Sequence, residues 1–142
     1  MTFPQPQFGF FPYAAVLARD YLLTRVPSNY AVSTLVPNPR PAKLIAVRTG
    51  TTSDPAAMRN PALSKRRLII WCYDTDEVSA CTVAEMVRGY MVEAMFQRGS
   101  GIRDTTVVGE PMYFPDPDDP AKTPRAQLTV DVLLRARFTP GS

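Results

Sequence analysis

Residues 68–94 read LIIWCYDTDEVSACTVAEMVRGYMVEA, an apolar strand run that leads directly into an amphipathic helix. The run from Leu68 to Tyr73 is apolar on both strand faces, which predicts a central strand covered on each side. Asp74 and Glu77 have the spacing of a capping box, with Asp74 as the N-cap. Apolar residues then recur on one helical stripe: Ala80, Val83, Ala84, Val87, Tyr90, Met91 and Ala94. The segment predicts a sheet with a helix packed against it.

Shorter elements surround this unit. A first helix is expected from Pro12 to about Arg25, because Pro suits the first helical position and Pro27 ends the helix. Four more strands are expected at residues 31–36, 43–48, 105–113 and 128–135, with Gly109 as the candidate bulge. The predicted fold is α+β: a small, mostly antiparallel sheet of four to five strands with two helices packed on one face, in one domain over residues 1–142.

Proline, with 15 residues, marks the breaks between these elements. Residues 1–11 alternate Phe with Pro and Gln, which predicts an extended N-terminal arm. Residues 49–64 lack periodicity and predict a long exposed loop. Residues 115–120 read PDPDDP, which predicts a rigid acidic turn.

Composition narrows the function classes. The 142 residues carry a formal charge of +3, and their cations are scattered rather than concentrated as in a DNA-binding domain. No apolar run approaches the roughly 20 residues of a membrane span. The first residues lack the basic start and apolar stretch of a signal peptide, so synthesis in the cytosol is expected.

Residue types that commonly carry catalysis are scarce. The chain has no His, which removes the commonest general base and metal ligand. Cys72 and Cys81 are expected to be buried or half-buried thiols rather than a disulfide or zinc site. Residues 99–101, GSG, lack the Lys and preceding strand of a phosphate loop, and residues 115–120 lack the Glu of a calcium loop. We therefore expect no enzymatic activity, no cofactor and no metal.

Two groups of side chains are candidate contact sites. Lys65-Arg66-Arg67 is either a charged strand entrance that discourages edge pairing, or a positive rim toward DNA or an acidic partner subunit. Arg135 and Arg137 join this candidate rim, on the strand face away from the apolar stripe. Two helices can cover only one face of a small sheet. Either Trp71 and Ile69 or, on the opposite face, Ile70 and Leu68 should therefore meet the arm or another chain. The candidate subunit or tail-tube interface consists of Phe3, Phe8, Phe10, Met58 and Arg59.

Four stretches between about Val16 and Arg137 are distinctive in their order and spacing. They are VPNPRP at 36–41, VRTG at 47–50, WCYD at 71–74, and PDP at 115–117 followed by PRAQLTVD at 124–131. Together with the order of elements, they resemble the tail terminator (tail completion) proteins of bacteriophages with long, non-contractile tails, especially those that infect actinobacteria. The arm of residues 1–11 and the loop of residues 51–64 exceed the family's minimum.

The resemblance implies a structural virion protein. It implies a hexameric ring that terminates the tail tube and joins it to the head-to-tail connector, while DNA passes through without being read. The implied partners are further copies of the chain, the tail tube protein, the connector or stopper protein and, non-specifically, genomic DNA. The implied location is the tail at the neck of the virion, after assembly in the host cytoplasm. The alternatives are another neck, head-closure or minor tail protein, and thirdly a small-ligand-binding α+β domain.

Overall fold

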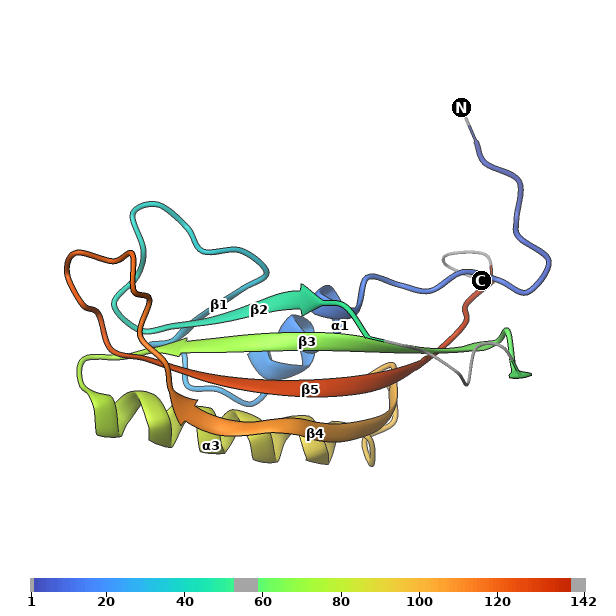
Figure 1. Cartoon of the computed structure of the whole chain (residues 1–142). Coiled ribbons are helices and arrows are strands. Elements are labelled where there is room, and N and C mark those ends of the chain that lie inside the picture. The colour runs from blue at the N-terminus through green and yellow to red at the C-terminus, as the bar shows by residue number, and fades with distance from the viewer. Residues whose placement is uncertain (1, 53–58, 139–142) are drawn as a thin grey trace.

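Five strands form one sheet in the order β1-β2-β3-β5-β4. The structure, a computed structural model, describes residues 2–52 and 59–138 (Figure 1). The strands are β1 (Ala31–Ser33), β2 (Leu44–Gly50), β3 (Leu63–Tyr73), β4 (Ile102–Tyr113) and β5 (Arg125–Arg135), and the helices are α1 (Ala14–Leu23) and α3 (Glu77–Ala94).

The central strand is β3, as residues 68–73 predicted. It pairs antiparallel with β5 along its whole length, from Leu63 opposite Arg135 to Tyr73 opposite Arg125. Its other neighbour is β2, also antiparallel, and only the β1–β2 pair is parallel. The predicted α+β class with a mostly antiparallel sheet is confirmed.

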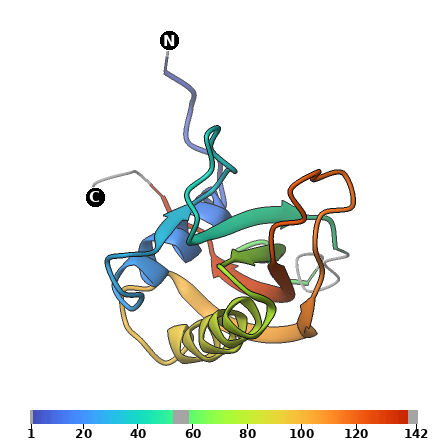
Figure 2. The same cartoon turned by 90° about the vertical axis from the view of Figure 1, so that its left-hand side faces the viewer.

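Both helices cover the same face of the sheet (Figure 2). Alternate residues of β3 and β5 point to this face, because side chains along a strand alternate between its two sides. The core there contains Ala15, Ala18, Leu22, Ile45, Val47, Leu68, Ile70, Ala84, Val87, Met91, Leu128, Val130, Val132 and Leu134. The predicted stripes of residues 80–94 and 128–134 are therefore confirmed as core. Among the described residues, no helix combines the length and apolarity that crossing a bilayer requires.

The N-cap of α3 is Asp76, so the expectation of Asp74 was wrong. The Asp76 Oδ1 atom accepts a 2.8 Å hydrogen bond from the Ser79 backbone N–H, and this contact lowers the pKa of the carboxyl. Asp74 instead lies buried where β3 ends, and accepts from the Tyr30 hydroxyl at 2.5 Å and the Thr75 N–H at 2.7 Å. Residues 74–76 make the turn between the end of β3 and the first residue of α3.

Several predicted boundaries differ from the structure. Lys65-Arg66-Arg67 lies within β3 instead of before it, because β5 is long enough to pair with these residues. β2 also runs on to Gly50, so the connection predicted as residues 49–64 is shorter at both ends. Gly99 and Gly101 have φ angles of +88° and +79° in the turn that follows α3, and the bulge expected at Gly109 is confirmed by register shifts there.

The sheet has two ends of different character. At the arm end, β3 begins, β5 finishes and β4 begins, with Leu63 paired to Arg135 and Ile102 to Leu134. At the loop end, residues 34–43 and 114–124 project beyond the strands (Figure 1). β5 has 11 residues, which separates the two ends by about 35 Å at ~3.3 Å per residue.

Val87 is fully buried between α3 and the sheet. We expect Val87→Asp to place an unpaired carboxylate there and to lower the free energy of unfolding by at least ~2 kcal/mol. Urea denaturation followed by circular dichroism measures this loss. A variant that stays folded with wild-type stability would mean that this stripe is not core.

Candidate functional site

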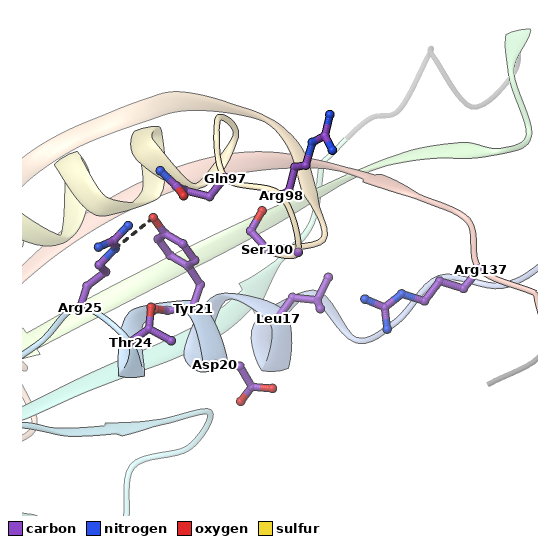
Figure 3. Close-up of a pocket in the computed structure, with 10 residues that line it drawn as sticks. Leu17, Asp20, Tyr21, Thr24, Arg25, Gln97, Arg98, Ser100 and Arg137 are labelled. Atoms are coloured by element: carbon purple, nitrogen blue, oxygen red, sulfur yellow. Dashed lines mark hydrogen bonds between the residues drawn. The ribbon is translucent and has the colours of Figure 1, made fainter. Parts of the chain in front are cut away.

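A recess of about 670 Å³ opens at the arm end on the helix side (Figure 3). One wall is the outer side of α1 and the residues just after it, and the other is the turn that joins α3 to β4. Arg137, beyond the end of β5, closes the side toward the arm. The lining consists of Leu17, Asp20, Tyr21, Thr24, Arg25, Gln97, Arg98, Gly99, Ser100 and Arg137.

An ionic network fixes the α1 wall of the recess. The Tyr21 hydroxyl donates to Glu93 at 2.9 Å and accepts from the Arg25 Nε atom at 3.3 Å, and the Arg25 guanidinium lies 2.6 Å from the same carboxylate. Burial raises the pKa of Tyr21, and the hydrogen bond to Tyr21 raises the pKa of Arg25. The network ties α1 to α3, so the charge of Arg25 is matched by Glu93.

The other charged side chains of the recess differ in whether they have an ion-pair partner. Asp20 is paired with Arg19 at 3.0 Å. The guanidinium groups of Arg98 and Arg137 are exposed and make no ion pair with a described residue. Arg137 extends toward Leu17, whereas Arg98 turns outward at the rim (Figure 3). The recess therefore attracts an anionic group.

The polar groups of the recess suit binding better than covalent chemistry. The Ser100 hydroxyl donates to the Ala94 carbonyl at 2.7 Å and accepts from the Ile102 N–H at 3.1 Å, so it is held in the turn. Nucleophilic catalysis requires a nucleophile beside a general base, and no described lining residue supplies that pair. Within residues 2–52 and 59–138, no three metal-ligating side chains lie close enough together to hold an ion.

The sheet face opposite the helices, which we call the open face, is held by bonds within the chain. Arg67 donates two hydrogen bonds to Asp131, at 2.8 and 3.1 Å, and Asp131 is 6% exposed. The Trp71 indole N–H donates to the Gln127 side chain at 2.9 Å. These pairs join β3 to β5 across the face, so they stabilise the sheet and leave these groups little capacity for a ligand.

Aromatic rings and arginines cover the open face at the loop end. The Arg125 guanidinium lies 4.5 Å from the centre of the Trp71 ring and is 4% exposed, while Arg40 lies 4.6 Å from the centre of the Tyr73 ring. Arg40 also donates to Thr123 at 2.7 Å, which joins the two projecting loops. Either Trp71 and Ile69 or Leu68 and Ile70 were expected to meet the arm or another chain. Leu68 and Ile70 are buried in the core beneath the helices, and on the open face Arg125 lies over the Trp71 ring.

The last residues of the arm anchor it, because Phe11 packs against the core and Phe10 bonds to Arg137. Phe10 exchanges two backbone hydrogen bonds of 2.7 Å with Arg137. Gly9, with a φ of +81°, passes so close to the Arg137 carbonyl that a side chain there would collide with it. Beyond this anchor the side chains of Phe3 and Phe8 are 84% and 53% exposed. Phe10 itself is half-buried.

The other predicted contact residues do not gather in one place. Arg59 is exposed in the connection before β3, and Met58 lies outside the described residues. Along β3 the basic run alternates: Lys65 and Arg67 point to the open face, whereas Arg66 points to the helix side and lies 5.3 Å from the Phe11 ring. The three side chains of this run therefore do not share one face of the sheet.

Arg135 and Arg137 do not lie on one face of the sheet, so the expectation that they share a face was wrong. β5 finishes at Arg135, which is exposed, and the chain then turns so that Arg137 reaches the recess. Sequence reasoning missed Arg25, Arg98 and the recess itself. Their positions depend on how two helix ends meet, and no local pattern in the sequence signals that.

Burial also decides which titratable groups are reactive. Burial raises the pKa of the Cys72 thiol, which lies wholly inside the core, and the half-buried Cys81 is shifted the same way. Burial and the bond to Asp74 raise the pKa of Tyr30 to about 12. These groups remain protonated at neutral pH and act as packing and hydrogen-bonding residues.

The pairing of several cations with carboxylates generates a prediction about nucleic acid. Tight binding of the phosphate backbone requires many cations on one surface and falls steeply with salt. Here Arg67 is paired with Asp131 and Arg88 with Glu110. We expect feeble, salt-sensitive DNA binding without sequence preference, measured by gel shift at physiological salt. Tight, sequence-selective binding would contradict this expectation and the tail-terminator interpretation with it.

Comparison with known proteins adds no family assignment. No family model matches the chain. No curated protein matches it either.

Proposed function

We propose that the chain is a structural subunit of a phage tail: a tail terminator that assembles as a hexameric ring, ends the tail tube and meets the head-to-tail connector. The resemblance suggests the role. The observation that carries the proposal is the arm, which leaves Phe3 and Phe8 exposed before it is anchored at Phe10 and Phe11. Aromatic side chains held away from their own fold are suited to contact another molecule.

Large apolar side chains are exposed on several other parts of the surface. Ring subunits need such surfaces, because each must meet two neighbours as well as a tube and a connector. The exposed large apolar residues are Phe3, Phe8, Tyr13, Leu23, Leu35, Val36, Val78, Met86, Phe96, Val108, Met112, Phe114 and Phe138. Their spread over α1, α3, β4 and both ends supports a protein with several contact surfaces.

The edge strands argue against assembly by simple strand addition. β4 is an edge strand of 12 residues, but its register shifts on both sides of Gly109, and Pro111 lacks a backbone N–H. The other edge, β1, has only three residues. Bulges, prolines and short edges prevent open-ended sheet extension. A closed ring built through the arm and the two ends of the sheet is consistent with such edges.

The first test is the mass in solution. We expect the wild-type protein to sediment as a hexamer at high concentration, and Phe3→Ser/Phe8→Ser to shift it toward the monomer. Both side chains are exposed in the subunit, so the thermal unfolding temperature of the subunit should not change. Sedimentation equilibrium with parallel circular dichroism measures the two effects.

The matched control is Gln5→Ser/Gln7→Ser, since both side chains are exposed on the same arm but are not aromatic. It should leave the mass unchanged. A wild-type protein that remains a monomer at every concentration would overturn the proposed ring. If the Phe3→Ser/Phe8→Ser variant still sediments as a hexamer, the arm is not part of the interface.

The second test separates a terminator from a head-closure protein. Electron microscopy of a phage that lacks this gene should show overlong or unjoined tails, because polymerisation of the tube is no longer stopped. Tails of normal length beside leaking heads would instead assign the chain to head closure. Complementation with the wild-type gene should restore the tail length.

A further inference from the structure

Charged residues are segregated between the two ends of the sheet. The arm end carries most of the cations that have no carboxylate partner among the described residues: Arg59, Arg66, Arg98, Arg103, Arg135 and Arg137. Of the described carboxylates near them, Asp131 is paired with Arg67, Asp20 with Arg19 and Glu93 with Arg25, and Asp104 is exposed. The arm end is therefore positive, and the recess between Arg98 and Arg137 is its concave part.

The loop end has the opposite surface charge. The carboxylates of Asp76, Glu77 and Asp118 are exposed there. Two of its cations, Arg40 and Arg125, lie instead over the Tyr73 and Trp71 rings and contribute little to the surface. Lys122 is the exposed exception among the described residues of the 114–124 turn.

Asp118 is the residue of this turn best placed to meet a partner. Asp116 accepts from the Asp118 backbone N–H at 2.9 Å, and Asp119 accepts from the N–H groups of Ala121 and Thr123 at 2.9 and 3.2 Å. The hydrogen bond to Thr123 lowers the pKa of Asp119. These two carboxylates hold the turn together, and the side chain of Asp118 is left exposed at its tip.

We infer that the turn around Asp118 of one copy docks in the recess between Arg98 and Arg137 of the next copy. The inference rests on the proposed ring and names its electrostatic contact. About 35 Å separates the two ends along the sheet, so one chain cannot make the contact with itself. Joining two different surfaces of identical copies is a heterologous contact, which closes into a ring when the rotation between copies allows.

A carboxylate fits the recess better than a nucleic acid does. A phosphate backbone is bound by a row of cations along a groove. The recess instead holds two guanidinium groups that have no carboxylate partner among the described residues, with Asp20 on the α1 wall. That arrangement suits a projecting carboxylate, and Asp118 is such a group in the turn at the opposite end.

The experiment reverses the charge of the recess and the charge of the turn in separate variants. Arg98→Glu/Arg137→Glu alters the recess and Asp118→Arg alters the turn. All three side chains are exposed, so the variants should keep the wild-type circular dichroism spectrum and unfolding temperature. Each variant alone should raise the dissociation constant of the oligomer by roughly tenfold or more in sedimentation, because like charges then meet. A 1:1 mixture should recover assembly, since each altered surface then has an opposite charge to face.

The matched control is Glu85→Arg, which changes the charge as Asp118→Arg does, at an exposed position on α3 away from both ends. It should assemble as the wild type does.

Restored assembly in the mixture supports the inference, together with weaker wild-type assembly at high salt. Unchanged assembly of either single-end variant, or a mixture that stays monomeric, overturns it and leaves the ring itself intact. A wild-type monomer overturns the proposed function instead. Loss of DNA binding without loss of assembly would identify the recess as a phosphate site and also overturn the inference.

Discussion

The pairing of β3 with β5 over eleven residues is the constraint on which the rest of the structure depends. It aligns Leu68 and Ile70 with the Leu128 and Val130 stripe on the side where the helices pack. On the other side it brings Arg67 against Asp131. A shift by one residue would exchange these sets, placing the ion pair in the core and the apolar stripe outside. The register is therefore specified on both faces.

The same pairing determines where the charged groups lie. Because β3 and β5 run antiparallel along their whole length, the basic start of β3 and the basic finish of β5 are brought to one end. The acidic turn that precedes β5 is carried to the other end. The subunit becomes electrostatically unequal along its long axis, although its formal charge is only +3. Unequal ends favour repeated head-to-tail contact between copies.

Local patterns predicted the elements well where one period dominated. The stripe of α3 and the alternation of β5 were both recognised, since burial against one partner imposes a period of 3.6 or 2 on a sequence. The prediction failed where tertiary contacts override local signals. Asp74 has the spacing of a cap but is bound by Tyr30 from a distant segment, and Lys65 looked like a loop boundary but is paired with Leu133 of β5.

By itself, the sequence determined the class of fold, the central strand, the apolar stripes and the turn positions, because these depend on residue types at fixed spacing. It also limited the chemistry, since a chain without His lacks the commonest general base. Only the tertiary structure decided that Arg137 leaves the face of Arg135 for the recess, and that Arg98 lines the same recess. These arginines come from segments far apart in the chain. They line one recess because α1 packs beside the α3–β4 turn. The spacing of residues within a short segment does not predict this packing.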